Sequence, residues 1–296
     1  MLAHIQTALD LIRAYEPPEG YYVAFSGGKD SVVTLHLVQQ AGVKFTVHHN
    51  LTGIDPPELV RFIRANYPEM IYERPRHPIA KSIVTCGLPS RLNRWCCASV
   101  KEHGGAGMTV VTGIRAAESS RRSKRNCQEP ARKGGGHFVH PIFRWSTGQV
   151  WDYIHENNLP YCSLYDEGFK RIGCVMCPQK STHERLKDMA RWPKTAAIWY
   201  RGAVASWERG TPGCKKFATA DDYWGWWLSG RRNAPRLIGG DVVKPLLVID
   251  DIGKVRPKDT SFLQGVLYRV IDDRYNRHQI MQVQLCRMEV DELPHA

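Results

Sequence analysis

The sequence predicts an α/β protein with a doubly wound, mostly parallel sheet, a Cys-rich helical extension and a small C-terminal appendage. Three observations support this fold class. Short β-rich runs alternate with helical stretches through the first half of the chain, their connections are short, and a Gly-rich turn joins the first run to a helix. The expected boundaries are 1–158 for the α/β domain, 159–240 for the extension and 241–296 for the appendage.

The elements of the α/β domain follow from hydrophobic periodicity and turn residues. The N-terminal stretch MLAHIQTALDLIRAYEPPEG is typical of an amphipathic helix. Strands are predicted at 21–25, 44–49, 70–72, 108–113 and 138–142. Helices are predicted at 30–40, at 56–66, which prolines open, and at 147–156, where Ser146 is the expected N-cap.

The second half of the chain is less regular. Residues 159–178 are Cys-rich without a clear period, and 182–208 form a basic, Trp-containing helical stretch. Residues 210–240 are rich in Gly, Trp and Arg, and strands are not expected to dominate there. From 242 the pattern starts afresh, with an apolar run at 245–249 and a helix at 261–273. We find no internal repeat.

Composition and charge exclude several classes of protein. Hydrophobic residues make up 43% of the 296 residues and charged residues 24%, which is typical of a packed protein and excludes disorder as the main state. No apolar run approaches the roughly 18–20 residues that a membrane span needs, and the N-terminus lacks the pattern of a signal peptide, so we expect a soluble, cytoplasmic protein with no membrane partner. The formal net charge of +12 favours a polyanionic partner.

A phosphate-binding loop is predicted between the first strand and its helix. It consists of Ser26, Gly27, Gly28, Lys29, Asp30 and Ser31. The glycines let the backbone approach an anion, the serine hydroxyls donate to phosphate oxygens, and the lysine neutralises the outer phosphates. Asp30 is expected either to cap the helix or to hold Mg²⁺. The alternative is an ordinary strand-to-helix turn.

Four of the nine cysteines have the spacing of a metal site. They are Cys96, Cys97, Cys174 and Cys177. Four thiolates suit either a [4Fe–4S] cluster or structural zinc, and two adjacent cysteines reach a wider cubane more easily than one small ion. Cys162 is an alternative to Cys97 as a ligand. Buried free cysteines are the other interpretation, and we expect ordinary packing or surface roles for the rest: Cys86, Cys127, Cys214 and Cys286.

Two basic segments are candidates for binding a polyanion. Residues 115–133 form a flexible basic loop at the carboxyl end of a strand, which could clamp the α-phosphate or a nucleic-acid backbone, or could simply be solvated. Residues 170–201 interleave Lys and Arg with tryptophans. Trp192, Trp199 and Trp207 could stack on bases, or could lie in the core.

Five segments give the chain a family resemblance: SGGKDS, LTGIDPPEL, RWCCASVK, TGIRAAESSRR and the stretch from HPIFRW to IGCVMCP. In order and spacing they resemble the PP-loop of the adenine nucleotide α-hydrolase-like superfamily, and within it the phosphoadenosine phosphosulfate reductase family, over about residues 20–200. The resemblance implies a PP-loop domain at 1–158 that binds ATP and Mg²⁺. It also assigns to the nucleotide site Gly113, Arg115, Glu118 and Ser119, and makes Lys29, Asp30 and Arg115 the expected catalytic residues.

One difference separates two branches of this family. Sulfonucleotide reductases usually carry a degenerate loop and a Glu-Cys-Gly nucleophile motif, whereas this chain keeps SGGKDS and its late Cys286 lies in LCRME. The chain therefore resembles the ATP-using branch, which implies adenylation of DNA or tRNA, a [4Fe–4S] cluster, and a sulfur-donor protein such as a cysteine desulfurase. The alternatives are an adenylyl sulfate reductase and a non-catalytic regulatory protein that binds a nucleotide or DNA.

The C-terminal stretch resembles part of another protein class. The run PLLVIDDIG and the helix after it resemble the Walker B region of bacterial helicase-loader ATPases. Asp250 and Asp251 would then stand where a carboxylate binds Mg²⁺. Since no Walker A motif occurs in the chain, we expect a fused fragment that packs or mediates contacts rather than a second ATPase.

Overall fold

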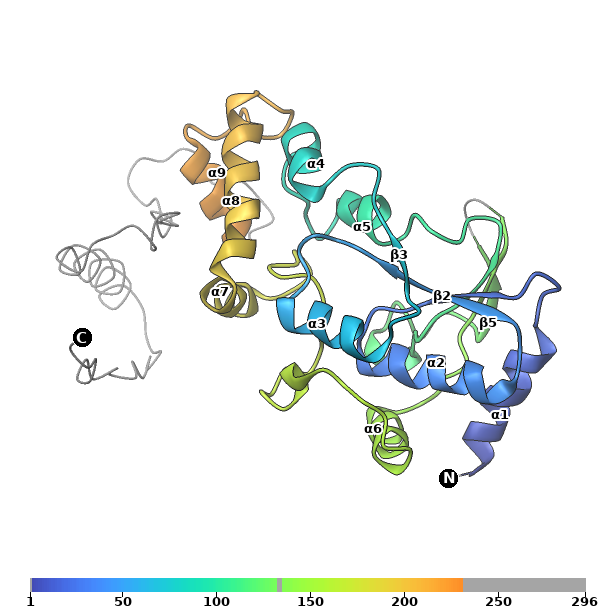
Figure 1. Cartoon of the computed structure of the whole chain (residues 1–296). Helices are drawn as coiled ribbons and strands as arrows, with labels where there is room; N and C mark the ends of the chain where they lie inside the picture. The colour runs from blue at the N-terminus through green and yellow to red at the C-terminus, as the bar shows by residue number, and fades with distance from the viewer. Residues whose placement is uncertain (1, 132–134, 231–296) are drawn as a thin grey trace, which may run out of the picture. The chain divides into compact units, whose positions relative to one another are not determined.

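The computed structural model describes residues 2–131 and 135–230, and the predicted C-terminal appendage lies outside them. A six-stranded sheet with the order β3-β2-β1-β4-β6-β5 forms the centre of the described part (Figure 1). Its strands are β1 (Tyr21–Ala24), β2 (Phe45–Asn50), β3 (Ile71–Glu73), β4 (Thr109–Val111), β5 (Gln128–Pro130) and β6 (His137–Val139). All pairs are parallel except β5 with β6. The predicted α/β fold with a mostly parallel sheet is confirmed.

Nine α-helices and two 3₁₀ turns belong to the described residues. The helices are α1 (Leu2–Ala14), α2 (Lys29–Ala41), α3 (Pro57–Asn66), α4 (Ile79–Cys86), α5 (Trp95–Val100), α6 (Thr147–Glu156), α7 (Thr182–Arg191), α8 (Pro193–Glu208) and α9 (Ala220–Ser229). The turns are η1 (Ala116–Glu118) and η2 (Ser163–Tyr165). Helix α2 packs against α1 and α6, and α8 packs against α4, α7 and α9. Figure 1 shows α2 and α3 on one face of the sheet and α5 on the other.

Local sequence signals explain the best-predicted elements. Strand β1 is buried, and the Tyr21 hydroxyl donates to the Ile12 carbonyl at 2.7 Å, which ties α1 to the sheet. Helix α2 ends at Gly42, whose φ of 72° suits a glycine. The Ser146 cap of α6 is confirmed, because its hydroxyl accepts from Gln149 N–H while the Gln149 side chain accepts from Ser146 N–H.

The Trp-containing stretch forms part of a helical core, so of the two predicted roles for its tryptophans the structure supports the core role for Trp192 and Trp199. Trp199 is fully buried, donates to the Val175 carbonyl at 3.0 Å and stacks on Trp227. Trp192 is 6% exposed, and Trp207 donates to the Phe217 carbonyl. The single predicted helix is two helices, since the chain turns at Trp192 and Pro193 opens α8.

The basic loop is more ordered than expected. It contains η1 and the edge strand β5, and two of its arginines form ion pairs four residues apart along the chain, Arg122 with Glu118 and Arg125 with Glu129. Strand β4 is shorter than predicted, because Thr112 onward turns toward the loop after β1. Helices α4, α5 and α9 were not predicted.

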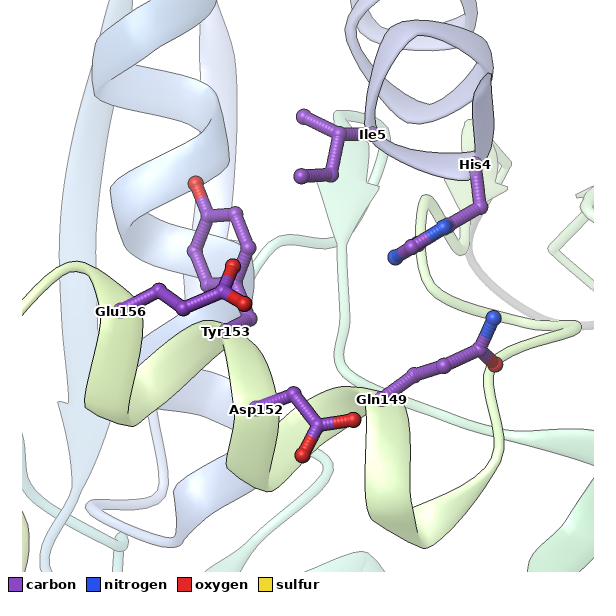
Figure 2. A pocket seen from close by; sticks show the side chains of 6 residues that line it. All are labelled: His4, Ile5, Gln149, Asp152, Tyr153 and Glu156. Atoms are coloured by element: carbon purple, nitrogen blue, oxygen red, sulfur yellow. The ribbon is translucent and has the colours of Figure 1, made fainter. Parts of the chain in front are cut away.

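A cavity of about 20 Å³ lies between α1 and α6 (Figure 2). Its lining residues are His4, Ile5, Gln149, Asp152, Tyr153 and Glu156. It has room for about one water molecule and is too small for a nucleotide. No helix within 2–131 and 135–230 is long and apolar enough to span a bilayer.

Candidate nucleotide site and cysteine cluster

The predicted phosphate loop lies where the strand order of the sheet reverses. From β1 the chain runs outward through β2 to β3 and then returns to β4 on the other side of β1. Open α/β sheets bind ligands at the carboxyl ends of the strands beside such a switch point. The loop of residues 26–31 leaves the carboxyl end of β1 and opens α2, so topology places it at the expected ligand crevice.

The loop backbone depends on its glycines. Gly27 has a φ of +75°, and a Cβ there would lie 2.7 Å from side-chain atoms of Leu59 and Ile63 in α3. Gly28 is the N-cap of α2, and its carbonyl accepts from Val32 N–H at 3.0 Å and from the Ser31 hydroxyl at 2.8 Å. The Ser26 hydroxyl donates to Ser31 Oγ at 3.2 Å. The loop is therefore a defined cradle at the positive end of a helix.

Three charged side chains form an ion network under the loop. Arg115 Nε lies 2.7 Å from Asp30 Oδ1, and Lys29 Nζ lies 3.3 Å from Asp30 Oδ2. Arg115 and Lys29 are buried, and Arg115 also donates to the Trp145 carbonyl. Asp30 does not cap α2, which corrects one of the two predicted roles, because both of its oxygens are engaged by cations. Its carboxylate thus holds the two cations, and its role as a ligand of Mg²⁺ stays a prediction.

The segment after β4 approaches the loop closely. A Cβ on Gly113 would lie 2.8 Å from the backbone carbon and oxygen of Asp30, so only glycine fits there. Gly113 and Arg115 therefore lie against the phosphate loop, and their contact with a nucleotide stays a prediction. Glu118 accepts from Arg115 N–H and pairs with Arg122, and the Ser119 hydroxyl accepts from Arg122 N–H, so these two side chains hold their own turn.

Tyr165 is a contact of the loop that sequence reasoning missed. Its hydroxyl accepts from the backbone N–H of Lys29 at 3.0 Å, and Lys29 Nζ lies 5.5 Å from the centre of its ring. Burial raises the pKa of this hydroxyl. No local pattern could have identified Tyr165, because its contact joins residues 136 positions apart.

Cys96 and Cys97 lie on α5. Cys96 is buried, and Arg94 donates to Cys97 Sγ at 3.2 Å. A hydrogen bond from Cys96 and the Arg94 guanidinium lower the pKa of Cys97 to about 6. The bond to Cys97 and burial raise the pKa of Cys96, and the charges of Cys97, Cys177 and Cys174 add to this shift. The four predicted ligands therefore gather in one region.

The turn that carries the other two cysteines is anchored to the loop between β2 and α3 and to α7. Val175 N–H donates to the Ile54 carbonyl at 2.8 Å, and Met176 N–H donates to Asp188 at 2.6 Å. Arg91, which precedes α5, donates to the carbonyls of Pro178 and Lys180. These bonds bring segments more than 80 residues apart to the same place.

Lys101 is a second neighbour of the cysteines that sequence reasoning missed. Its ammonium hydrogen-bonds to Cys174, and the charges of Cys174 and Asp55 raise its pKa. Cys162, the proposed alternative ligand, is fully buried near Glu58, Arg61 and Glu167. The arrangement favours Cys97 over Cys162 as the partner of Cys96.

The donor set does not form a site for one metal ion. Within the described ranges, no three His, Cys, Asp or Glu side chains are arranged to hold a single ion. The four thiols nevertheless influence one another, and cationic Arg94 and Lys101 stand beside them. Thiolates with cationic neighbours are suitable donors for a [4Fe–4S] group or for zinc, and which of the two these cysteines hold stays a prediction.

Comparisons with known proteins relate the chain to one family. The sequence profile of the phosphoadenosine phosphosulfate reductase domain matches residues 20–180. The chain is 33% identical over 191 residues to the uncharacterized protein MJ0066 of Methanocaldococcus jannaschii, covering 60% of this chain and 40% of that protein. It is 26% identical over 184 residues to the adenosine 5'-phosphosulfate reductase of Allochromatium vinosum, covering 57% and 72%.

A solved structure with a detectable likeness is the phosphoadenylyl-sulfate reductase of Candida auris, crystallised as a phosphate complex. Its TM-score is 0.47 at 20% identity, over 58% of this chain and 89% of that one. The chain spans less than half the length of MJ0066 and of a second M. jannaschii relative, MJ0973. Because the family profile covers more than half of the residues, and includes the phosphate loop and all four clustered cysteines, this chain belongs to the phosphoadenosine phosphosulfate reductase domain family.

Proposed function

We propose that this protein binds ATP at residues 26–31, cleaves it between the α and β phosphates, and so adenylates a nucleic-acid oxygen that sulfur then replaces. The observation that carries this proposal is the complete loop, with Lys29 and Arg115 held by Asp30 at the positive end of α2. A leaving pyrophosphate needs concentrated positive charge, whereas a sulfate ester needs less of it.

The proposed reaction has a simple balance of atoms. An oxygen of the acceptor attacks the α-phosphorus, the bond to the oxygen bridging the α and β phosphates breaks, and pyrophosphate leaves with the electron pair. The acceptor then carries AMP, and a sulfur nucleophile displaces AMP in a second step. Lys29 and Arg115 favour the first step by neutralising charge, and the glycine backbone positions the phosphates. Mg²⁺ is expected to arrive on the nucleotide, since Asp30 is engaged by both cations.

The cysteine cluster is the proposed site of a [4Fe–4S] group. Cys96, Cys97, Cys174 and Cys177 would hold it, and zinc is the alternative metal. If only three of these thiols bound the cluster, its fourth iron would be free to carry sulfur, whereas four bound thiols would leave no iron open. Arg94 and Lys101 would offset the negative charge of the thiolates and of the group that they hold.

A nucleic acid, DNA or tRNA, is the proposed acceptor. Its support is the net charge of +12 and the exposed Lys170 and Arg171, which precede the cysteine turn. The charge of Arg171 acts on Tyr165, so this basic pair lies near the phosphate loop. A cysteine desulfurase is the proposed sulfur donor.

The decisive experiment measures the products of ATP. The purified protein is incubated with Mg²⁺, ATP labelled in the α-phosphate, and either tRNA or DNA, and AMP and pyrophosphate are quantified. We expect both products, and a loss of about 100-fold or more in Lys29→Met, which keeps the apolar stem but removes the ammonium. Lys44→Met is the matched control, because Lys44 is exposed at the opposite, amino end of β2. ATP left intact by the wild-type protein with either acceptor would refute the proposal.

The metal is tested separately. The protein is purified anaerobically and analysed for iron, acid-labile sulfide and zinc. We expect iron and sulfide in the wild type, little of either in Cys177→Ser, and unchanged content in Cys86→Ser, which alters an exposed cysteine outside the cluster. A colourless protein that contains zinc and no iron would contradict the [4Fe–4S] proposal and identify the cysteines as a zinc site.

Reduction of an adenylyl sulfate is the second candidate, because several similar proteins are named adenosine 5'-phosphosulfate reductases. That reaction transfers two electrons from a thiol pair and releases sulfite and AMP. Sulfite formed from adenosine 5'-phosphosulfate with a dithiol reductant, without pyrophosphate release from ATP, would favour it. If neither sulfite nor pyrophosphate is formed, the remaining candidate is a regulatory protein that only binds a nucleotide or DNA.

A further inference from the structure

The donors of the phosphate loop are already occupied by hydroxyl groups of the protein. The Lys29 N–H donates to Tyr165 Oη at 3.0 Å, and the Gly28 N–H donates to Ser26 Oγ at 3.4 Å. A Cβ on Gly28 would lie 3.4 Å from the same tyrosine oxygen. Tyr165 thus stands directly over the first turn of α2, where a phosphate oxygen would bind.

Two contacts hold the ring of Tyr165. The Lys29 ammonium lies 5.5 Å from the ring centre, and the ring of Trp151 packs nearly perpendicular to it, with the ring centres 5.1 Å apart. Just before it in sequence, Cys162 and Leu164 are fully buried. Its buried neighbours and its ring contacts together fix the position of the Tyr165 side chain over the loop.

Tyr165 also begins the segment that leads to the cysteine turn. Gly168 N–H donates to the Tyr165 carbonyl at 3.1 Å, and Phe169 N–H donates to the Leu164 carbonyl at 3.1 Å. Cys174 follows nine residues after Tyr165. A movement of the Tyr165 backbone would therefore act directly on the first of these bonds and, through Leu164, on the second, and so on the segment that leads to Cys174.

We propose that Tyr165 competes with nucleotide phosphate for the Lys29 N–H, and that its displacement signals nucleotide binding to the segment that carries Cys174. This inference rests on the proposed function of the loop. The single hydrogen of an amide cannot serve two acceptors at full strength, and an anionic phosphate oxygen is a better acceptor than a neutral hydroxyl. Only molecules in which Tyr165 has released the Lys29 N–H can bind the phosphate there. The apparent association constant for the nucleotide is therefore the intrinsic one multiplied by the fraction of such molecules.

The first test is the affinity for pyrophosphate and ATP, measured by calorimetry on the full chain. Tyr165→Phe keeps the ring and removes the competing oxygen, so we expect binding about two- to tenfold tighter, the range of one net hydrogen bond. Tyr161→Phe is the matched control. Tyr161 lies on the same segment and packs against Trp151, but its hydroxyl donates to Asp166 at 3.1 Å. We expect its affinity to equal that of the wild type.

The second test needs no substitution. Hydrogen exchange at the amides of Gly168 and Phe169 is measured with and without pyrophosphate. We expect exchange to quicken on binding in the wild type, and to be already fast in Tyr165→Phe and unaffected by pyrophosphate there.

The outcomes separate this inference from the proposed function. Equal or weaker binding by Tyr165→Phe, or wild-type exchange that pyrophosphate leaves unchanged, would overturn the competition while ATP binding still supports the loop as a nucleotide site. If neither folded protein binds pyrophosphate or ATP, the proposed function fails and the inference with it.

Discussion

The guanidinium of Arg115 is 3% exposed, and its donors serve Asp30, the Trp145 carbonyl and Thr147. This one side chain joins the segment after β4 to the loop after β1 and to the start of α6. Because both Asp30 oxygens already bind cations, the network stabilises the fold before any nucleotide arrives. A residue expected to contact phosphate therefore also has a structural role.

We expect Arg115→Ala to destabilise the protein by about 3 kcal/mol, since removing one partner leaves a poorly compensated carboxylate. Arg115→Lys should cost less, because a lysine can still pair with Asp30 but cannot serve the other two acceptors. Urea unfolding measures both. Arg121→Ala, on the exposed part of the same segment, is the control and should change stability by less than about 0.5 kcal/mol. A wild-type midpoint for Arg115→Ala would contradict this role.

His140 makes stability depend on pH. It is fully buried, lies 2.8 Å from Thr112 Oγ1 and faces Glu129 at 3.5 Å. Burial and the nearby Arg125 lower its pKa from 6.5 to about 4. The folded protein therefore binds the proton less readily than the unfolded chain, so the stabilisation is complete above pH 6.5 and is lost as the pH falls from there toward 4.

We expect this single group to remove about 2 kcal/mol of stability between pH 7 and pH 5. The measurement is the free energy of unfolding in urea at both pH values. In His140→Gln the loss of stability in acid should be smaller by that amount. His137→Gln, at an exposed histidine that begins β6 three residues earlier, should keep the wild-type dependence. Parallel pH profiles for wild type and His140→Gln would show that His140 is not the cause.

At the scale of elements, sequence signals succeed where one local cause dominates. The apolar run of β1, the glycines before α2 and the Ser146 cap of α6 were each predicted from neighbouring residues. Helix α9 was missed because its cap pairs Thr219 with Asp222 in place of the usual Glu or Gln, and because aromatic residues surround it. The edge strand β5 exists only through its pairing with β6.

The candidate site divides in the same way. The phosphate loop and the four cysteines were identified from residue type and spacing alone. Tyr165 and Lys101 were not, since each acts through a contact between distant segments. The buried tryptophans were assigned two possible roles because composition does not reveal which face of a helix is covered.

The close approach of the segment after β4 to α2 gives a test at the scale of elements. A methyl group at Gly113 would meet the Asp30 backbone at 2.8 Å, so Gly113→Ala should push the loop away from β4. We expect a stability loss of about 1–3 kcal/mol and ATP binding at least about tenfold weaker. Gly148→Ala, where the new methyl would lie 3.7 Å from Ser146 Oγ in the first turn of α6, is the control and should be neutral or slightly stabilising. Unchanged ATP affinity in Gly113→Ala would show that the loop tolerates this movement.

At the scale of the whole molecule, only some of the basic side chains are available to bind a polyanion. Many basic side chains are consumed by structure: Arg115, Arg122, Arg125, Arg185 and Arg191 are bound to carboxylates or carbonyls. Lys170 and Arg171 are exposed, and the charge of Arg171 reaches Tyr165 at the phosphate loop, while Lys44 is exposed at the amino end of β2. A nucleic acid that presents an oxygen to the loop would therefore meet the first two but not the third.

The salt dependence of binding tests this arrangement. Anisotropy of labelled tRNA and duplex DNA gives the association constant across a series of salt concentrations, and for a duplex each phosphate neutralised contributes a slope of about −0.9 on logarithmic axes. We expect a steep slope for the wild type, a slope shallower by about two phosphate contacts for the double variant Lys170→Glu, Arg171→Glu, and a wild-type slope for Lys44→Glu. Lys44→Glu is a matched control, since it also reverses the charge of an exposed lysine. An association constant of the wild type that does not change with salt concentration would exclude a nucleic acid as the acceptor and favour a small molecule. The reason is that only a polyanion releases a condensed layer of counterions on binding.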